Sequence, residues 1–397
     1  MRITLLNPTH YSIGSRVPGE VLPPLGLLAI GGPLIDAGFA VQLVNADRLN
    51  LSPRATVDAV IATAPDAVLI GHSGSTSAHP LVVDLAQRLR VALPAVKIVY
   101  GGVFPSYHWA EVLADVPQID VIVRGEGEAT APAQMALLAA GGDLATLPGI
   151  AFRCDGQPHA TASAPMLEDL DSVRIGWELI DFADYSYWGG KRAVVLQFSR
   201  GCPHLCTYCG QRGFWTRWRH RDPVKFAAEI AWLVREHGIE LVNLADENPT
   251  SSRRVWKDFL KALVAEGVKV LIVGSTRADD IVRDADLLPL YKQAGCLRFL
   301  LGLEGTDEAT LQTVQKGGSR AKDRQAIDLL RQNGMIGLCT FAVGFEEETD
   351  ADYLRLLRHL LAYDPDQVMS VYATPHRWPP FHGQSAHRRV IQTDLRL

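Results

Sequence analysis

The most informative stretch of this sequence reads Ser199-Arg-Gly-Cys-Pro-His-Leu-Cys-Thr-Tyr-Cys-Gly210, with Cys202, Cys206 and Cys209 at C-x3-C-x2-C spacing. The apolar run over residues 193–198 precedes it and predicts a short buried strand, so the cysteines should lie on the loop that leaves the carboxyl end of this strand. Three thiolates this close in sequence can converge on one metal centre. Because iron–sulfur clusters take four ligands, three cysteines would leave one iron open to a ligand from outside the protein.

A zinc site and three unrelated thiols are the competing interpretations of the cysteines. Zinc sites usually combine one closely spaced cysteine pair with a second pair of cysteines or histidines. His204 lies inside the loop and His220 close behind it, so zinc stays open. A disulfide would leave one cysteine of the triplet unpaired. We therefore favour an iron–sulfur cluster.

Length and composition indicate a globular protein with room for two domains. The chain has 397 residues, of which 47% are hydrophobic and 21% are charged, and this composition is not that of a disordered protein. Its net charge of −5, with both signs interspersed, argues against a nucleic-acid-binding surface. Three of the six cysteines cluster, which fits a metal site in a reducing cytoplasm.

The amino-terminal segment does not read as a targeting or membrane-spanning sequence. Residues 1–6 read directly as a strand, without the charged n-region, long apolar segment and cleavage site of a signal peptide. The most apolar amino-terminal run, residues 21–39, contains Pro23, Pro24, Pro33 and Asp36, which predicts a helix of a soluble domain. We therefore expect a cytoplasmic protein without a transmembrane segment.

Residues 1–135 alternate short apolar strands with helical stretches, which predicts a doubly wound, Rossmann-like, mostly parallel α/β sheet. Ligands of such sheets bind outside the carboxyl ends of the strands. Three loops at those ends are rich in glycine, which lets the backbone approach a ligand, and in hydroxyl groups, which form hydrogen bonds. Ordinary turns are the competing interpretation. The candidate binding residues on these loops are Ser73, Ser75, Gly101, Gly102, Gly125 and Glu126.

Residues 136–190 read as a connector that includes a hairpin with its turn at Asp155-Gly156. From residue 191 to residue 375, strands and helices alternate again, and six such repeats predict a partial (β/α)6 barrel whose active site gathers at the carboxyl ends of the strands. The expected strands span residues 193–198, 241–245, 270–275, 299–303, 337–343 and 367–373, and the expected helices 223–237, 252–266, 284–294, 307–314, 321–333 and 350–362.

Charged residues follow three of these predicted strands. Asp246 and Glu247 come after the second strand, Arg277 after the third and Glu304 after the fourth. Carboxylates can hold an ammonium group through charge-assisted hydrogen bonds, and a guanidinium suits a carboxylate. The competing interpretation is structural, because acidic residues before a helix that begins near Ser251 also cap helices.

The segment behind the cysteines, residues 211–222, combines aromatic and basic side chains. Phe214, Trp215 and Trp218 could stack on a flat macrocycle, and Arg217, Arg219 or Arg221 could meet its carboxylates. Packing against the amino-terminal domain is the simpler explanation. A single-stranded nucleic-acid site has a similar composition, but the acidic chain counts against it.

The cysteine motif after a first strand, with the aromatic Tyr208 before the third cysteine, resembles the radical S-adenosylmethionine (SAM) enzymes. The resemblance implies that Cys202, Cys206 and Cys209 hold a [4Fe–4S] cluster and that the amino and carboxylate groups of SAM chelate the open iron. Electron transfer would then cleave SAM to a 5′-deoxyadenosyl radical, which abstracts hydrogen from the substrate. The further SAM-binding candidates are Tyr208, Asp246, Glu247, Arg277 and Glu304.

The amino-terminal loops resemble the cobalamin-binding domain that precedes the radical domain in one subclass of these enzymes. The resemblance includes Leu22-Pro-Pro-Leu-Gly-Leu-Leu28 and Arg124-Gly-Glu-Gly-Glu128, and it implies cobalamin as a third cofactor. The chain contains no Asp-x-His-x-x-Gly in this domain, so we predict no histidine as the lower axial ligand. His72 is interpreted as a hydrogen-bonding loop residue.

Within this subclass the chain resembles the anaerobic oxidative cyclases of bacteriochlorophyll synthesis. The segments that carry the resemblance are Cys206–Trp215, Trp218–Asp222, Ala245–Thr250, Thr374–Trp378 and Val390–Asp394. These cyclases form the isocyclic ring from a magnesium-porphyrin ester with oxygen taken from water, which implies a tetrapyrrole substrate and a flavodoxin- or ferredoxin-type electron donor. Members of the family continue further, so we expect residues 376–397 to be a truncated tail.

Two other functions fit the same domain order. A cobalamin-dependent radical SAM methyltransferase would use the same two domains, and only the product separates it from a cyclase. A carrier that binds a corrinoid or a tetrapyrrole without catalysis would not cleave SAM. These alternatives remain open at the level of sequence.

Overall fold

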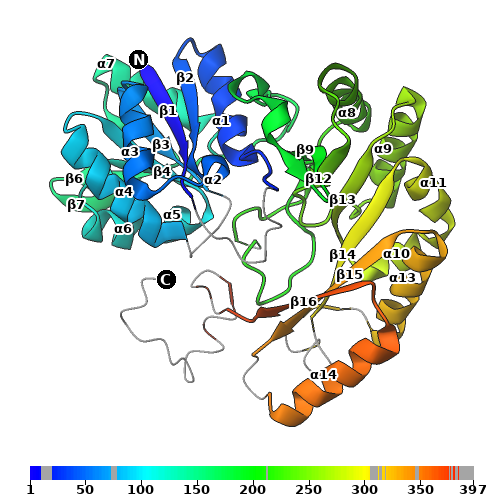
Figure 1. The fold of residues 1–397 in the computed structure, drawn as a ribbon. Helices are drawn as coiled ribbons and strands as arrows, with labels where there is room; N and C mark the ends of the chain where they lie inside the picture. Colours follow the sequence, from blue (N-terminus) through cyan, green and yellow to red (C-terminus); the bar gives the residue numbers. More distant parts are fainter. Residues whose placement is uncertain are drawn as a thin grey trace. The chain divides into compact units, whose positions relative to one another are not determined.

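The computed structural model describes residues 1–9, 20–72, 78–211, 213–304, 312, 315–317, 319–344, 348–374, 376, 379–380 and 383. The chain forms two compact units (Figure 1). One consists of the described residues of Met1–Glu168 and Ser172–Ser186, and the other of Asp169–Asp171 and the described residues from Tyr187 onward. Across the described residues, no helix is both long enough and apolar enough to cross a bilayer.

The first unit is built on a seven-stranded sheet with the order β2-β1-β3-β4-β5-β6-β7. The first five strands in this order pair in parallel, and β6 and β7 add an antiparallel hairpin to the edge at β5. This confirms the predicted doubly wound, mostly parallel sheet. The strands are β1 Arg2–Asn7, β2 Ala40–Asn45, β3 Ala67–Ile70, β4 Lys97–Gly101, β5 Val121–Val123, β6 Ile150–Cys154 and β7 Gln157–Ala160.

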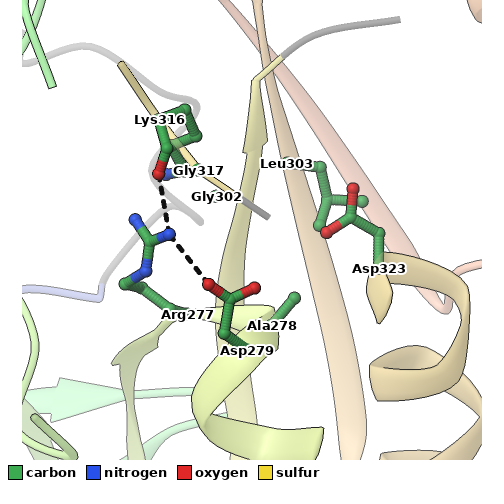
Figure 2. Close-up of a pocket in the computed structure, with 8 residues that line it drawn as sticks. All are labelled: Arg277, Ala278, Asp279, Gly302, Leu303, Lys316, Gly317 and Asp323. Atoms are coloured by element: carbon green, nitrogen blue, oxygen red, sulfur yellow. Dashed lines mark hydrogen bonds and ion pairs between the residues drawn. The ribbon is translucent and has the colours of Figure 1, made fainter. Parts of the chain in front are cut away.

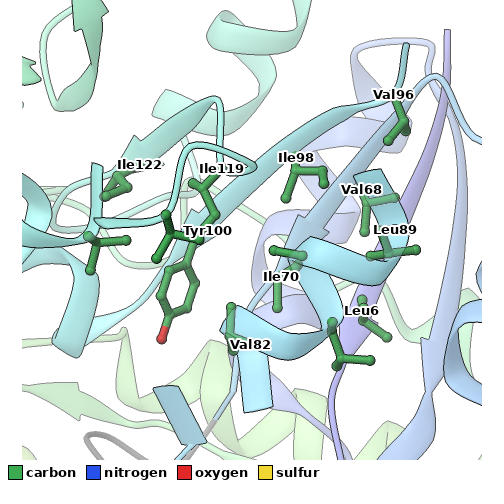
Figure 3. Close-up of a cluster of buried hydrophobic side chains, with 14 of the residues drawn as sticks. Leu6, Val68, Ile70, Val82, Leu89, Val96, Ile98, Tyr100, Ile119 and Ile122 are labelled. Carbon is green, nitrogen blue, oxygen red and sulfur yellow. The ribbon is translucent and has the colours of Figure 1, made fainter. Parts of the chain in front are cut away.

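Helices cover both faces of this sheet, because successive strand residues point to opposite sides. Leu6 and Ile70 belong to one buried cluster (Figure 3), whereas Leu5 and Leu69 belong to the cluster on the other face. The helices are α1 Leu25–Asp36, α2 Ala46–Leu49, α3 Pro53–Ala62, α4 His79–Ala92, α5 Val103–Tyr107, α6 Trp109–Asp115 and α7 Thr130–Ala140, with 3-10 turns η2 Leu144–Thr146, η3 Trp177–Leu179 and η4 Phe182–Asp184.

The predicted hairpin is present and belongs to the first sheet. Cys154 pairs with Gln157 across a two-residue turn, and both turn residues, Asp155 and Gly156, have positive φ angles, as the favoured hairpin turn requires. Helix α7 runs across residue 135, so part of the segment expected as a connector is built into the first unit. The bounds of the domains stay a prediction.

The second unit contains the six predicted strands in the order β16-β15-β14-β13-β12-β9, with β8 beside β9. All six pair in parallel, and Figure 1 shows that the sheet curls, as the expected partial barrel does. The strands are β8 Ser186–Tyr187, β9 Lys191–Leu196, β12 Leu241–Leu244, β13 Leu271–Thr276, β14 Cys296–Glu304, β15 Ile336–Val343 and β16 Gln367–Tyr372, with the short antiparallel pair β10 Ser199–Arg200 and β11 Arg219–His220.

The helices of this unit follow the prediction except in one place. The expected helix over residues 284–294 is only partly confirmed, because α11 covers Leu288–Gln293, residues 285–287 form a 3-10 turn, and α10 over residues 278–283 was not predicted. The carboxylate of Asp284, fully buried at this break, accepts hydrogen bonds from Arg253, Arg283 and Tyr291. The helices are α8 Pro223–His237, α9 Arg253–Glu266, α10 Ala278–Arg283, η5 Ala285–Leu287, α11 Leu288–Gln293, α13 Arg320–Gln332 and α14 Asp350–Tyr363. Most of the expected helix over residues 307–314 lies outside the described residues.

Gly295 fixes the start of β14 in a way that only glycine allows. Its φ is +95°, and a Cβ atom there would overlap the carbonyl oxygen of Val270. Gly267 also has a positive φ, +68°, but a Cβ atom there would meet nothing within 4 Å. The two positions therefore separate the cost of the backbone conformation from the cost of the overlap.

We expect Gly295→Ala to lower the free energy of unfolding by more than about 3 kcal/mol, because it adds steric overlap to the positive φ. Gly267→Ala, the matched control, should cost only about 1–2 kcal/mol. Urea denaturation midpoints of the full chain, followed by circular dichroism, measure both. Equal losses in the two variants would contradict the close approach of Gly295 to Val270.

Candidate functional site at the carboxyl ends of the strands

The cysteine loop begins at a residue that the core holds firmly. Phe198 follows β9, is fully buried, and its ring packs against those of Phe226 and Phe259 at 5.2 and 5.1 Å. Strands β10 and β11 then close the loop by pairing Ser199 with His220. Gly201 has a φ of +83°, and a Cβ atom there would stand 2.5 Å from the carbonyl oxygen of Arg217. The two arms of the loop thus approach closely where the cysteines begin.

The three cysteines of the motif lie on this loop and form no disulfide. Cys206 is buried, and Cys202 and Cys209 are half-buried. Burial raises the pKa of the Cys202 thiol, and negative charge on Cys206 and Cys209 raises it further, whereas a hydrogen bond from the backbone of His204 and the charge of Arg277 lower it. Cys206 and Cys209 are therefore close enough to Cys202 to affect its ionisation.

The thiols are not gathered around one point. Among the described residues, no three His, Cys, Asp or Glu side chains are arranged to hold a single metal ion. A [4Fe–4S] cluster distributes its cysteine ligands over different irons, so it needs three neighbouring thiols rather than three that converge. Tyr208, the predicted aromatic of the motif, is half-buried on the same loop.

Two adjacent carboxylates at the end of β12 contact the start of the cysteine loop. Asp246 accepts hydrogen bonds from the backbone N–H of Phe198 at 3.0 Å and from the N–H and hydroxyl of Ser199. Glu247 accepts one from the N–H of Gly201 at 3.2 Å. Burial raises the pKa of Asp246 to about 7 and that of Glu247 to about 8. Their roles toward a cofactor stay a prediction.

Arg277 lies at the end of β13 and lines a small pocket (Figure 2). Its Nη2 donates to Asp279 at 3.0 Å and to the carbonyl oxygen of Lys316 at 2.8 Å. Its Nε is buried and has no hydrogen-bond partner among the described residues. The pocket is lined by Arg277, Ala278, Asp279, Gly302, Leu303, Lys316, Gly317 and Asp323.

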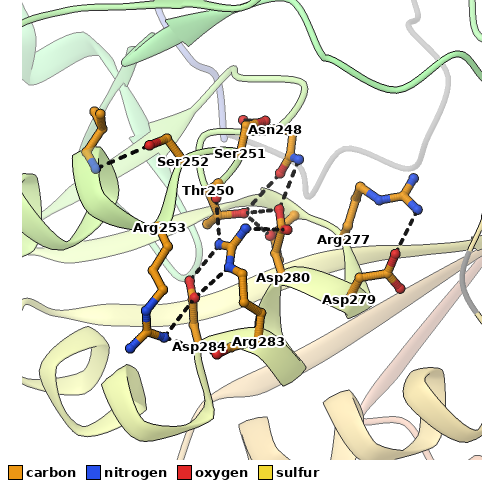
Figure 4. Close-up of polar contacts among 12 residues, drawn as sticks. Asn248, Thr250, Ser251, Ser252, Arg253, Arg277, Asp279, Asp280, Arg283 and Asp284 are labelled. Atoms are coloured by element: carbon orange, nitrogen blue, oxygen red, sulfur yellow. Dashed lines mark hydrogen bonds and ion pairs between the residues drawn. The ribbon is translucent and has the colours of Figure 1, made fainter.

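A buried polar network fixes the wall beside Arg277 (Figure 4). Asp280 accepts hydrogen bonds from Asn248 at 3.0 Å and from Thr250 at 2.8 Å, and it pairs with Arg283. Arg283 also donates to the carbonyl oxygen of Thr250 at 2.8 Å. The loop after β12 and the first helix after β13 are thereby held together. None of Asn248, Thr250 and Asp280 was among the predicted site residues, because their partners are distant in sequence.

Two of the aromatic and basic side chains behind the cysteines have structural partners. Trp218 donates through Nε1 to the carbonyl oxygen of Asn248 at 3.2 Å. Arg221 pairs with Asp171, at 2.6 Å, and with Glu229. Arg221 is therefore engaged in a structural ion-pair network, and the interpretation that it meets a ligand's carboxylate is not supported.

Three predicted site residues lie wholly or partly outside the described part of the chain. Glu304 ends β14, and its side chain lies outside the described residues. Ser73 and Ser75 also lie outside them. Gly101 ends β4, and Gly102 follows it with a φ of +115°.

The glycines of the first sheet lie at its carboxyl edge. A Cβ atom on Gly102 or on Gly125, whose φ is +81°, would meet nothing within 4 Å. Ser106 links them, because its hydroxyl donates to the carbonyl oxygen of Gly102 and accepts from the N–H of Gly125. Glu126 is engaged by the N–H of Leu167 at 2.7 Å. The backbone is thus exposed to a ligand at two glycines that one serine connects.

Family comparisons match both units. The model of the radical SAM superfamily matches residues 196–360, and that of the B12 binding domain matches residues 11–134. The chain is 59% identical over 394 residues to the anaerobic magnesium-protoporphyrin IX monomethyl ester cyclase of Synechocystis sp., and the match covers 99% of this chain and 79% of the relative. The chain belongs to this cyclase family.

The chain is also similar to a more distant cyclase and to a methyltransferase. The cyclase of Rubrivivax gelatinosus is 33% identical, with 96% of this chain and 68% of the relative covered. An uncharacterized methyltransferase of Pyrococcus horikoshii is 25% identical, with 95% of this chain and 81% of the relative covered. Identity thus falls from the cyclases to the methyltransferase, which is only a distant relation.

Solved structures share the fold. The radical SAM methyltransferase TsrM of Kitasatospora setae, solved with cobalamin and a [4Fe–4S] cluster bound, matches with a TM-score of 0.78 at 16% identity. That match covers 97% of this chain and 74% of TsrM. The enzyme OxsB, solved with aqua-cobalamin and SAM bound, matches with a TM-score of 0.74 at 18% identity, and the match covers 90% of this chain and 51% of OxsB. These neighbours confirm the fold of the cyclase chain.

Membership of these families brings three cofactors, and the described residues fit them. The radical SAM domain implies a [4Fe–4S] cluster and SAM, and the B12 binding domain implies cobalamin. The three neighbouring thiols have the donor chemistry that such a cluster would need. The unsatisfied Nε of Arg277 suits a carboxylate, and the open glycines of the first sheet suit close approach by a large ligand.

Two histidines, His72 and His79, follow β3 at the carboxyl edge of the first sheet. His72 shares a hydrogen bond with the hydroxyl of Tyr100 at 2.9 Å, the kind of contact that its interpretation as a loop residue predicts. His79 is buried, and its ring stacks on Phe104 at 4.4 Å. Burial lowers the pKa of His79 to about 4, with the charge of His108 acting in the same direction.

We expect acid to destabilise the chain through His79. The unfolded chain protonates this histidine near pH 6.5, and the folded chain only near pH 4, so its contribution to stability is lost as the pH falls through this window. The loss at pH 4.5 should be on the order of 2 kcal/mol. His79→Phe should remove it, whereas His159→Phe, at an exposed position, should not. Identical denaturation midpoints against pH for wild type and His79→Phe would contradict the assignment.

Proposed function

We propose that the chain is a radical SAM, cobalamin-dependent oxidative cyclase that forms the isocyclic ring of (bacterio)chlorophyll. Its substrate would be magnesium-protoporphyrin IX monomethyl ester, and its oxygen would come from water under anaerobic conditions. The observation that carries this proposal is the 59% identity to a cyclase over 99% of the chain, which spans both units. The cysteine loop and the carboxyl edge of the curled sheet support it.

In this proposal, Cys202, Cys206 and Cys209 are the cluster ligands. When bound, the cluster and SAM supply a 5′-deoxyadenosyl radical through reductive cleavage of SAM, and cobalamin supplies a redox partner. Arg277 binds the carboxylate of SAM through the Nε that has no partner among the described residues. Glu247, which already accepts the N–H of Gly201, binds the ammonium of SAM with its remaining acceptor capacity.

The other candidate residues complete the site. Tyr208 and Glu304 would contact SAM from the cysteine loop and from the end of β14. The cobalamin contacts would come from the carboxyl edge of the first sheet, where two glycines leave open space. These residues are Ser73, Ser75, Gly101, Gly102, Gly125 and Glu126.

The partners of the proposed reaction follow from its chemistry. The substrate is a tetrapyrrole, and Phe214 and Trp215 beside the cysteine loop offer half-buried aromatic surface for it. Reduction of the cluster needs a low-potential donor, for which we propose a flavodoxin- or ferredoxin-type protein. None of the six cysteines, all of which the structure describes, forms a disulfide, which supports our proposal of a reducing compartment, the cytoplasm.

Replacing any one of Cys202, Cys206 and Cys209 by alanine should abolish the cluster and SAM cleavage. The loop supplies three thiolates, and the proposed cluster needs all three as ligands. Iron and sulfide analysis of anaerobically reconstituted protein, with detection of 5′-deoxyadenosine, measures both. Cys154→Ala, an exposed thiol on the hairpin, is the matched control and should retain both. Full iron content and SAM cleavage in a motif variant would contradict the assignment of the cluster.

Turnover of the porphyrin ester tests the reaction itself. Reconstituted wild type with SAM, cobalamin and a reductant should convert magnesium-protoporphyrin IX monomethyl ester, in oxygen-labelled water, to a product with labelled oxygen and fewer hydrogens. Accurate mass of the pigment measures this. An added methyl group would instead identify a methyltransferase, and protein that binds the pigment without cleaving SAM would be a carrier.

A further inference from the structure

Asp246 is the most deeply buried carboxylate beside the cysteine loop. Its side chain belongs to the loop that leaves β12, and only 4% of the residue is exposed. Its two partners, Phe198 and Ser199, precede it in sequence by 48 and 47 residues. A carboxylate in this position was expected to meet an ammonium group, but the structure directs it to the backbone.

The contacts of Asp246 use both of its oxygens. Oδ2 accepts from the N–H of Phe198 at 3.0 Å, and Oδ1 accepts from the N–H of Ser199 and from its hydroxyl at 2.6 Å. A carboxylate only accepts hydrogen bonds, so three donors around it are satisfied together. Asparagine in its place would turn an N–H2 group toward at least one of these donors.

These contacts lie where the chain changes from core to loop. Phe198 is anchored in the aromatic core, and Ser199 begins β10, whose pairing with β11 closes the loop. The next backbone contact is the N–H of Gly201, which donates to Glu247. The two neighbouring carboxylates therefore hold three backbone N–H groups in the four residues before Cys202.

We propose that Asp246 is a positioning residue that fixes the start of the cysteine loop, and so the place of Cys202, rather than a ligand of SAM. This inference rests on the proposed function, because it concerns the loop that would carry the cluster. It divides the two acidic residues by role: Asp246 holds the backbone, and Glu247 remains for the ammonium of SAM.

The charge of Asp246 agrees with this role. Burial raises its pKa, whereas the hydrogen bonds from Ser199 and Phe198 lower it. The loop donors thus stabilise the charged form, although burial has the larger effect and keeps the pKa raised. Loss of the loop contacts would leave a buried carboxylate without compensation, which is costly, so the loop and Asp246 stabilise each other.

The test uses Asp246→Asn in the full chain, reconstituted anaerobically with iron and sulfide. Retention of the cluster against a chelator should fall roughly 10- to 100-fold, as when partners that orient metal ligands are removed. The electron paramagnetic resonance spectrum of the reduced cluster should also change. Ser199→Ala removes one of the three hydrogen-bond donors and should give a smaller loss of cluster retention. If Asp246→Asn does not fold, Ser199→Ala is the variant that tests the inference.

The matched control is Asp284→Asn. Asp284 is equally buried, and its partners are Arg253, Arg283 and Tyr291 rather than the cysteine loop. This variant should lower the melting temperature and leave the cluster spectrum unchanged. A merely structural effect of losing a buried carboxylate would instead alter both variants alike.

Three results would overturn the inference. The first is a wild-type cluster spectrum and wild-type retention in both Asp246→Asn and Ser199→Ala. The second is an unchanged cluster spectrum with SAM binding weakened more than tenfold, which would make Asp246 a SAM ligand. The third is a wild-type chain that assembles no cluster, which would overturn the proposed function as well. If only the expected result for Asp246→Asn is not obtained and the wild type assembles its cluster, the inference about Asp246 is wrong and the proposed function is unaffected.

Discussion

The ring of Phe198 is fully buried where the chain leaves β9, in contact with the rings of Phe226, Trp256 and Phe259. Burial of such a side chain contributes roughly 1.5–3 kcal/mol, and here it also anchors the residue from which the cysteine loop departs. The backbone N–H groups that follow are held by Asp246 and its neighbour Glu247. The aromatic core therefore fixes where the loop begins, and the carboxylates of buried Asp246 and half-buried Glu247 hold the backbone that follows. The place of the three thiols depends on both.

In the described part of the polar wall next to this loop, the buried carboxylate of Asp280 is satisfied by arginine, hydroxyl and amide donors (Figure 4). Arg277 differs, because its buried Nε has no partner among the described residues. An unsatisfied buried donor costs about 1–3 kcal/mol, a cost that a bound carboxylate removes. A rigid wall with one such donor is a preorganised site for an anion, and the proposed position of the SAM carboxylate uses it.

Most strands of both sheets could be predicted because they are rich in apolar residues that become buried, and the cysteine loop because its spacing is local in sequence. Contacts between distant residues could not be predicted. The partners of Asp246 lie 48 and 47 residues away, and Asp171 lies 50 residues from Arg221. The sequence therefore left ligand roles open for Asp246 and Arg221, and the structure engages both within the protein. The break at Asp284 was missed for the same reason, since Arg253 reaches it from another helix.

The central claim is that the carboxyl edge of the curled sheet brings the side chain of a tetrapyrrole to the SAM-derived radical. The most direct test is isotope transfer with magnesium-protoporphyrin IX monomethyl ester that carries deuterium on its methylpropionate side chain. We expect deuterium in the 5′-deoxyadenosine released during a single turnover of the reconstituted chain. Cyclised pigment formed together with 5′-deoxyadenosine that contains no deuterium would contradict it, because hydrogen abstraction would then not occur at this side chain.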